Sequence, residues 1–482
     1  MINKFLLSVL ILLTVCPFAF AQEYAALQTA TAEDLLLFWE EKDLYVETAT
    51  RHFKPISQAA ENMTVVTAKD IEDMNAHTLY EVLNRVTGVV VSPQGGDFAS
   101  SALVFIQSPV HRTDMSRHVL VLLDGVVWNL AQANAVLNQI PVAIVDRIEI
   151  IKGPASSAWG SSLGGVINVI TKKAGDTKRP SGLLSTSYGE GESQDYNAGI
   201  SGKAGNLGYY LFAGKQRSEG IREDLDRHYD RNGFYAKIGI PLTKDLNLGF
   251  SGGYFDDDAT DGELLAGDII SNLLIRDIFF AASLNAALSE ELKLDISLYS
   301  STHKFEQDSR ALGSGLYDLS PFYVEVPGDP VENRLYEDDS IGGSAKLIWT
   351  YGVQSAVLGV DISHTEEDAK VAFGPYFQTI GHPEVLEDSP VIDKYAVYFN
   401  DTITIDSLSL TPGIRYDHNT ITGDFTSPSI GATFKAGEKT LLRLSAARGF
   451  TIPNTGMSSV GVFYTDPNPD IEAEEVRSYQ AG

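Results

Sequence analysis

The chain has 482 residues and a formal net charge of −28 at pH 7. This length exceeds one ordinary small domain, so two or more domains are expected. The excess of acidic over basic residues argues against nucleic acid as a partner, because phosphate binding needs a basic face. The composition of 22 Phe, 21 Tyr and 42 Gly favours β structure with many turns.

The first residues have the pattern of a secretory signal peptide. Lys4 precedes an apolar run over residues 5–15, and Ala19 and Ala21 form an A-x-A cleavage site. We therefore predict that residues 1–21 are removed. Cys16 is the only cysteine, so the mature protein is expected to have no disulfide.

Residues 22–56 are predicted to form a polar periplasmic leader. Within it lies an extended, β-branched run at residues 45–50. Its members are Tyr45, Val46, Glu47, Thr48, Ala49 and Thr50. A free β segment near a terminus can add to the sheet of another protein. The alternative is that this run is the first strand of the next domain, and the pattern alone leaves both open.

Residues 57–174 are predicted to form a compact α/β domain. We expect strands at 63–67, 89–91 and 119–123, and helices at 68–74 and 78–86. Thr78 and Glu81 have capping-box spacing at the start of the second helix, and Gly88 is expected to end it. Asp124-Gly125 is a tight-turn signal after the strand at 119–123. The domain lacks a phosphate-binding signature.

A glycine-dense stretch at 147–173 joins this domain to an unlike region. Strands are expected at 147–151 and 166–171, with small residues between them. Gly153, Gly160, Gly164 and Gly165 permit close backbone approach and positive φ. The bracketing apolar strands indicate a tightly folded connection and not a flexible linker.

From residue 178 onward the sequence alternates regularly between apolar and polar residues. About 14 segments of this kind occupy 178–482, for example at 234–240 and 292–298. Segments of this length in successive hairpins after a signal peptide are typical of an outer-membrane β-barrel. A soluble β-sandwich is the alternative. Connections at 256–275, 303–340, 366–390 and 449–474 are expected to be long external loops.

The chain resembles TonB-dependent outer-membrane receptors of the cobalamin and ferric-siderophore type. The resemblance lies in LLDGV at 122–126, RIE at 147–149, GP at 153–154, WG at 159–160 and GGVINVIT at 164–171. Two further motifs lie at 450–453 and 468–474. The signature residues are Asp124, Gly125, Arg147, Glu149, Gly153, Pro154, Gly160, Gly165 and Asn168.

The resemblance implies a plug domain inside a barrel of 22 strands, a size typical of plugged transporters. It implies a large ligand bound from outside, a TonB-type periplasmic partner that pulls residues 45–50, a monomer, and a location in the outer membrane of a Gram-negative-type bacterium. The resemblance also favours 45–50 as the TonB box. The small residues of 147–173 are then expected to pack the plug closely against the barrel wall.

Three features depart from the family pattern. Phe105-Ile106-Gln107-Ser108 stands where the family has an arginine-glycine pair. The strand count falls short of 22, and the chain ends at 477–482 inside a predicted strand, so we expect a truncated barrel. Residues 454–467 contain no histidine, which disfavours haem as the ligand.

The densest carboxylate cluster is predicted to lie in an external loop. Its members are Asp256, Asp257, Asp258, Asp261 and Glu263. Clustered carboxylates suit Ca²⁺, and a solvated acidic loop is the alternative. No other cofactor is expected. The histidines lack zinc-site spacing, and no catalytic arrangement is apparent, so the chain is not expected to be an enzyme.

Three functions compete. The first is an energised importer of a scarce large nutrient, such as a ferric siderophore or cobalamin. The second is a passive porin or adhesin, which would not need a domain at 57–173. The third is a signal-transducing receptor, which would need a further folded domain before the plug.

Overall fold

The computed structural model describes residues 45–94, 101–107, 118–131, 137, 139–220, 227–264, 268–437, 440–453, 455, 468 and 470–482. The chain divides into two units, 1–45 and 46–482. The predicted signal peptide and most of the predicted leader lie outside the described residues. None of the helices in the described ranges is long and apolar enough to cross a membrane.

A small α/β domain, the plug, precedes the large sheet. Its elements are β1 (Tyr45–Val46), β2 (Lys54–Pro55), β3 (Met63–Thr67), α3 (Ala68–Asp73), α4 (Leu79–Leu83), β4 (Val89–Gln94), β5 (Ser101–Ile106), β6 (Val119–Leu123), β7 (Val126–Val127), β8 (Val145–Lys152), α5 (Ser156–Trp159) and β9 (Gly165–Thr171). Five of them form a sheet in the order β3-β8-β9-β6-β7, in which only β6 and β9 are parallel. The predicted strands at 63–67 and 119–123 are confirmed.

The plug helices α3 and α4 each begin at a threonine cap, and the cap of α4 was predicted. In α3, Thr67 and Asp70 form a reciprocal capping box. In α4, the Thr78 hydroxyl accepts from the Glu81 amide at 3.3 Å, while the Glu81 carboxylate accepts from the amide of His77. The predicted extension of this helix to residue 86 was wrong, because α4 ends at Leu83. Residue 86 is a valine that remains buried beyond the helix, so the apolar periodicity reflected burial and not helix length.

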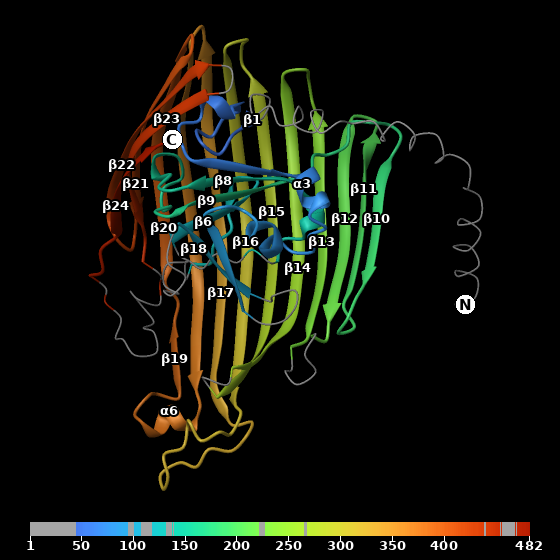
Figure 1. Ribbon diagram of the computed structural model, residues 1–482, viewed down its shortest axis with the longest axis vertical. Coiled ribbons are helices and arrows are strands. Elements are labelled where there is room, and N and C mark those ends of the chain that lie inside the picture. The colour runs from blue at the N-terminus through green and yellow to red at the C-terminus, as the bar shows by residue number, and fades with distance from the viewer. Residues whose placement is uncertain are drawn as a thin grey trace, which may run out of the picture. The chain divides into compact units, whose positions relative to one another are not determined.

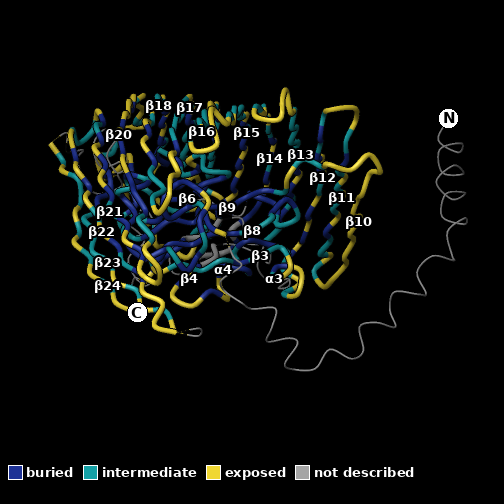
Figure 2. Tube along the Cα trace, turned by 90° about the horizontal axis from the view of Figure 1, so that it is seen from above, coloured by how far each residue is buried: buried dark blue, intermediate teal, exposed yellow. Residues whose placement is uncertain are grey.

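A large antiparallel sheet follows the plug. Its elements are β10 (Ser181–Tyr188), β11 (Gln194–Ala204), β12 (Leu207–Ser218), β13 (Tyr229–Pro241), β14 (Leu246–Leu264), β15 (Ile269–Ala287), β16 (Leu292–Ala311), β17 (Pro330–Tyr351), β18 (Gln354–Phe373), α6 (Pro375–Thr379), β19 (Val385–Asp388), β20 (Val391–Ile405), β21 (Leu408–Asn419), β22 (Gly423–Gly437), β23 (Thr440–Thr451) and β24 (Glu474–Ala481). All but β19 and α6 form one continuous path of neighbouring strands, and β19 pairs with β18. The sheet curves around the plug (Figures 1 and 2).

The two faces of the sheet differ as the alternation predicts. On β18 the apolar side chains of Leu358, Val360 and Ile362 are exposed on the outer face. The intervening Asp361 points inward and contacts the plug. An apolar outer face and a polar inner face are typical of an outer-membrane barrel.

Aromatic side chains of the sheet complete the core of the plug. Trp128 packs edge-on against Phe279, with ring centroids 5.3 Å apart, and against Phe255 at 6.3 Å. Both phenylalanines belong to the same buried cluster as the plug residues Ile148 and Ile167. The plug therefore shares a hydrophobic core with one side of the sheet.

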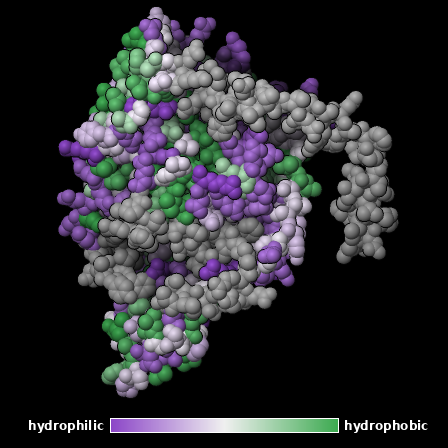
Figure 3. All heavy atoms as spheres, in the orientation of Figure 1, coloured by the Kyte–Doolittle hydropathy of each residue, from purple (hydrophilic) through white to green (hydrophobic). Residues whose placement is uncertain are grey.

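The two ends of the sheet are unequal. Connections such as 242–245 and 288–291 are short turns, whereas α6, β19 and the 312–329 connection lie at the opposite end (Figure 1). This end, which we call the external end, mixes apolar and polar side chains on its visible surface (Figure 3). The predicted loops at 256–275 and 303–340 were too long, because β14, β15, β16 and β17 extend into them. Both faces of these strand ends carry polar residues, so the apolar–polar alternation from which strands were predicted is missing there.

Candidate functional site

The predicted box is held by the carboxylate of Glu149, one of the plug signature residues. Glu149 is fully buried on β8. One of its oxygens accepts hydrogen bonds from the amides of Glu47 (3.0 Å) and Thr48 (2.9 Å) and from the Thr48 hydroxyl (2.6 Å). The other oxygen accepts from Arg147 Nε at 2.8 Å. Charge-assisted hydrogen bonds of this kind are about twice as strong as neutral ones.

The signature residue Asn168 and Trp159 of the WG motif also meet at Thr48. Asn168 Nδ2 donates to the Thr48 hydroxyl at 3.0 Å, and its own carbonyl accepts from the Gly125 amide at 3.2 Å. Trp159 Nε1 donates to the Thr48 carbonyl at 2.7 Å. Residues of β8, α5 and β9 therefore converge on Thr48, one residue of the N-terminal segment, a name we use below for residues 46–52.

Arg51 ties the N-terminal segment to the inner wall of the sheet. Its guanidinium donates to Asp361 at 2.5 Å and to Ser344 at 3.2 Å. It also lies over the rings of Trp159 and Tyr398, 4.3 and 4.5 Å from their centroids, which are favourable cation–π distances. The guanidinium is thus enclosed by a carboxylate, a hydroxyl and two aromatic faces.

A second arginine shares the same carboxylate. Arg415 Nη1 donates to Asp361 at 2.6 Å, and Arg415 Nε donates to Asp417 at 2.8 Å. Asp361 therefore accepts from one arginine of the N-terminal segment and one arginine of the wall. Sequence reasoning missed Arg51, Asp361 and Arg415. Arg51 and Asp361 lie 310 residues apart, so no local pattern connects them.

The turn at Asp124 and Gly125 anchors the plug to another part of the wall. Both residues have positive φ, +50° and +81°, and this conformation suits a two-residue hairpin turn. The Asp124 carboxylate accepts from the Thr171 amide and hydroxyl and from Lys237 of β13 at 2.9 Å. This signature position therefore links the plug to the sheet.

The signature glycines permit close packing, as predicted. A Cβ atom on Gly165 would lie 2.2 Å from the Ile151 carbonyl oxygen. One on Gly160 would lie 2.9 Å from the Asp417 carboxylate, and one on Gly153 would lie 2.3 Å from the Gln480 amide. The contact at Gly165 is with rigid backbone, so a side chain does not fit there. The neighbours of Gly160 and Gly153 are the ends of flexible side chains, and at these two positions it is the positive φ, +75° and +113°, that favours glycine.

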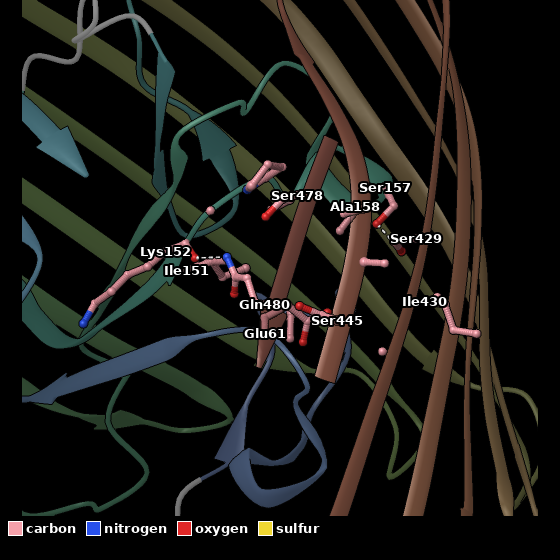
Figure 4. A pocket seen from close by; sticks show the side chains of 17 residues that line it. Glu61, Ile151, Lys152, Ser157, Ala158, Ser429, Ile430, Ser445, Ser478 and Gln480 are labelled. Carbon is pink, nitrogen blue, oxygen red and sulfur yellow. Dashed lines mark hydrogen bonds between the residues drawn. The ribbon is translucent and has the colours of Figure 1, made fainter. Parts of the chain in front are cut away.

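A narrow seam separates the 152–158 stretch from β22, β23 and β24 (Figure 4). Ser157 and Ser429 are hydrogen-bonded across it at 2.8 Å, and Gln480 Nε2 donates to the Lys152 carbonyl at 3.0 Å. Pro154 packs against Gly449, where a Cβ atom would meet the proline ring at 2.7 Å. The cavity in the seam has a volume of only about 30 Å³, which leaves room for about one water molecule.

The acidic cluster lies elsewhere than predicted. Asp256, Asp257 and Asp258 belong to strand β14 and not to a loop. Their carboxylates contact Arg276, Arg231 and His228, respectively. The side chains of Asp261 and Glu263 lie outside the described residues. Within the described ranges, no group of three or more His, Cys, Asp or Glu side chains is placed to hold a metal ion. Calcium binding stays a prediction.

The carboxylates of β14 are expected to differ strongly in their effect on stability. Asp257 and Arg231 form a buried, two-pronged pair at 2.9 Å, with side-chain exposure of 1% and 3%. Asp257→Asn should lower the free energy of unfolding by about 3–5 kcal/mol, because it leaves a buried cation unpaired. Asp256→Asn is the matched control and should cost below about 1 kcal/mol, since its pair with Arg276 is partly exposed. Denaturation in detergent micelles measures both, and equal effects would contradict this prediction.

His52 makes the docking of the N-terminal segment sensitive to pH. Its ring nitrogens contact the hydroxyls of Thr50 and Ser355, each at 3.0 Å. Burial, and then the charge of Lys54, lower the pKa of His52 to about 4. A released segment has an ordinary histidine pKa of about 6.5. The neutral ring therefore stabilises docking fully above pH 6.5, and this contribution is lost as the pH falls towards 4.

At pH 5 we expect docking to be weaker by about 2 kcal/mol than at pH 7. The protection factors of the amides of residues 46–52, which are corrected for the intrinsic pH dependence of exchange, should accordingly fall on acidification. His52→Gln keeps a hydrogen-bonding side chain but does not titrate, so its protection factors should change much less over the same range. An equal fall of the protection factors in both proteins would show that another group is responsible.

A plug domain that packs against the inner face of a curved sheet, whose outer face is apolar, is the arrangement found in plugged outer-membrane barrels. The family model for the TonB-dependent receptor plug domain matches residues 55–166, and the model for the TonB-dependent receptor-like β-barrel matches residues 208–482. The chain belongs to the TonB-dependent receptor family. It is an outer-membrane protein of the Gram-negative type, and the predicted fold class is confirmed.

Similar proteins include the vitamin B12 transporter BtuB of Vibrio vulnificus, which is 25% identical over 456 residues. That match covers 91% of this chain and 67% of the relative. Solved structures with the same fold include the ferric preacinetobactin receptor BauA of Acinetobacter baumannii, with TM-score 0.69, 14% identity, and coverage of 91% of this chain and 70% of BauA. FpvA of P. aeruginosa, bound to a ferric pyoverdine, has TM-score 0.71, 16% identity, and coverage of 91% and 62%.

Proposed function

We propose that this protein imports a scarce, large nutrient across the outer membrane with energy supplied by a TonB-type periplasmic partner. The observation that carries the proposal is the way in which the N-terminal segment is held. Thr48 and Arg51 are fixed by hydrogen bonds and ion pairs to the plug and the wall, and such contacts can break and reform. The predicted extended run is a strand only at Tyr45–Val46, and residues 48–51 form a turn in the docked state. On release this turn would straighten, so that the segment can pair with a partner sheet by β-addition.

The proposed ligand class is a cobalamin or a ferric siderophore. A relative named as a vitamin B12 transporter and solved receptors named for ferric siderophores support this class. The external end also carries an aromatic cluster. Tyr317 packs edge-on against Tyr376 at 5.1 Å, and Phe377 contacts both Tyr376 and His382. Phe377 is buried and the rings pack on one another, so this cluster stabilises the connections at the external end.

A passive porin or adhesin is the weaker alternative. A porin gains nothing from a domain that fills its lumen, whereas here the plug shares a core with the wall through Trp128 and Phe279. The Arg51–Asp361 pair and the Asp124–Lys237 pair add charged links between the two parts. A plug held by reversible polar links favours regulated passage.

The test is a binding titration followed by an uptake assay. Tryptophan quenching of the purified receptor is measured with cyanocobalamin, ferric enterobactin and ferric citrate. Uptake of each probe that binds is then measured in cells with and without a functional TonB protein. We expect saturable binding of at least one probe and uptake that requires TonB. Binding of none of them, or uptake that is independent of TonB, would overturn the proposal.

A further inference from the structure

The segment that joins the plug to the first strand of the large sheet is rich in basic residues. We call this segment, residues 172–180, the linker. Residues 172–179 contain four basic side chains and one acidic side chain, in a chain whose formal net charge is −28. Lys178 and Arg179, near the end of the linker, are both exposed. The linker is therefore a concentration of positive charge in an acidic protein.

The linker is fixed to the backbone of β11 and β12. The Gly175 amide donates to the Tyr209 carbonyl at 3.0 Å, and the Lys203 amide donates to the Thr177 carbonyl at 2.8 Å. A Cβ atom on Gly175 would lie 2.3 Å from the backbone nitrogen of Gly202, so the two backbones are in direct contact. The charges of the linker are therefore presented at a defined place on the sheet.

Two hairpins add further cations beside the linker. Lys203 lies at the end of β11, and Lys244 lies in the turn between β13 and β14. Because β11 to β14 are consecutive antiparallel neighbours, the turns after β11 and β13 lie at the same end of the sheet, opposite to α6 (Figure 1). Lys244 is 90% exposed, and its contact with Asp245 is 3.8 Å long. We call Lys178, Arg179, Lys203 and Lys244 the basic patch.

Carboxylates of the sheet and plug do not neutralise most of the basic patch. Within the ranges that the structure describes, no ion pair involves Lys178, Arg179 or Lys203. By contrast, three cations of β12 and β15 nearer the external end each lie within 3.0 Å of a carboxylate oxygen, namely Lys215, Arg217 and Arg276. Positive charge is therefore left uncompensated at the short-turn end of this acidic protein.

An aromatic side chain indicates that the basic patch lies at the level of the lipid headgroups. The Tyr210 hydroxyl donates to the Ala143 carbonyl of the plug, so the preceding Tyr209 faces the opposite, lipid side of the sheet. A Cβ atom on Gly202 would lie 2.7 Å from the Tyr209 hydroxyl oxygen and 3.3 Å from Pro180, which places the phenol beside the end of the linker. Tyrosines gather at membrane interfaces, and the short turns of such barrels lie on the periplasmic side. The basic patch therefore adjoins the headgroups of the periplasmic leaflet.

Other turns at this end of the sheet do not carry the same charge. The turn at 288–291 contains Glu290 and Glu291, and the turn at 352–353 has no charged residue. A rim of lysines that served only to keep the turns hydrated would not be confined to one side. The positive charge is instead concentrated where the chain of the plug enters the sheet.

We propose that the basic patch binds the headgroup phosphate of an anionic phospholipid in the periplasmic leaflet of the outer membrane. The Arg179 guanidinium offers a two-pronged contact to phosphate, and the lysine ammonium groups add point charges around it. The bound lipid anchors the linker, and with it the point where the plug joins the sheet, to the membrane surface. The proposal goes beyond the proposed function, because it depends on the outer-membrane location of the protein and not on transport.

The experiment measures lipid retention by the purified receptor with native mass spectrometry. The receptor in detergent micelles is equilibrated with equal amounts of dioleoylphosphatidylglycerol and dioleoylphosphatidylcholine. The parent protein should retain phosphatidylglycerol in preference to phosphatidylcholine. The triple variant Lys178→Gln, Arg179→Gln, Lys203→Gln should lower this preference about 100-fold, because each cation near an anionic lipid surface contributes about fivefold.

Two control variants separate this site from a general effect of charge. The triple variant Lys215→Gln, Arg217→Gln, Arg276→Gln removes three cations nearer the external end and should keep the preference. The variant Lys178→Arg, Lys203→Arg keeps the positive charges and should keep it too. No preference in the parent protein, or an equal loss in the two triple variants, would overturn the proposal. Displacement of the lipid by equimolar inorganic phosphate would also overturn it, since the site would then be one for a free anion.

Fluorescence quenching then locates the lipid. A fluorophore is attached to Asn206→Cys, in the turn after β11, or to Val353→Cys, in the turn after β17. Phosphatidylglycerol with a spin label near the top of its acyl chain should quench the fluorophore at 206 more than the one at 353. The difference should vanish in the triple variant of the basic patch, and equal quenching at both positions in the parent protein would overturn the site. Neither experiment uses a transported ligand or energy, so failure here is distinguishable from failure of the uptake assay.

Discussion

Glu149→Ala is expected to release the N-terminal segment from the plug. The substitution removes the acceptor for three donor groups at Glu47 and Thr48, all within 3.0 Å of one carboxylate oxygen. Hydrogen bonds to a charged group are worth about 1.5–3 kcal/mol each. Because neighbouring bonds are not additive, we expect a total loss of about 4 kcal/mol of docking free energy.

Hydrogen exchange checks this prediction directly, because the amides of Glu47 and Thr48 are two of the three donors. A loss of about 4 kcal/mol corresponds to an increase of roughly 10³-fold in their exchange rate, as long as the segment remains mostly docked. Asp146→Ala is the matched control. Asp146 lies on the same strand and contacts Arg147, but it makes no contact with the segment. Unchanged exchange in Glu149→Ala would show that the carboxylate does not hold the segment.

Asp361→Asn is expected to weaken docking more than Arg51→Ala does. Asp361 accepts from both Arg51 and Arg415, so the amide leaves two neighbouring guanidinium groups without their shared carboxylate. Breaking a buried pair in this way costs about 3–5 kcal/mol. In Arg51→Ala, by contrast, Asp361 keeps Arg415 as its partner, so no buried charge is left alone.

The critical result is which of the two substitutions, Asp361→Asn or Arg51→Ala, weakens docking of the N-terminal segment more. It can be measured in each variant by the mobility of a spin label attached to a cysteine at position 53, which adjoins the N-terminal segment and is exposed. Asp295→Asn is the control, because Asp295 faces the same wall and its contacts are with Asn285, at 2.9 Å, and Lys346, at 3.5 Å, both of them wall residues. It should leave the label immobilised. A larger effect of Arg51→Ala than of Asp361→Asn would contradict the shared role of the carboxylate.

Strands and turns were predicted correctly from the sequence where a single local signal determined them. The turn at Asp124-Gly125 and the strand at 119–123 follow from turn chemistry and a short apolar run, and both are confirmed. The inward and outward faces of β16 and β18 follow from alternation. The end of α4 was wrong because Val86 is buried outside a helix. The extent of β14 was wrong because its polar end keeps pairing where apolar alternation stops.

The candidate site could be predicted only in part. The signature at 147–171 pointed to Glu149 and Asn168, but not to their shared contact with Thr48. The role of Arg51 depends on Asp361 and Tyr398, which reach it only after the sheet has formed around the plug. Contacts between residues so far apart in sequence depend on strand register, which single-segment patterns do not specify.

The most direct test of the account is to tether the N-terminal segment to the plug. Thr48 and Asn168, whose side chains meet at 3.0 Å, are replaced by cysteine and bridged by a short bifunctional methanethiosulfonate. Cys16 is the only native cysteine and lies in the predicted signal peptide. With a probe that binds in the titration, the bridged receptor should keep its affinity, lose TonB-dependent uptake, and regain it on reduction. Uptake at the full rate with the bridge intact would contradict the account.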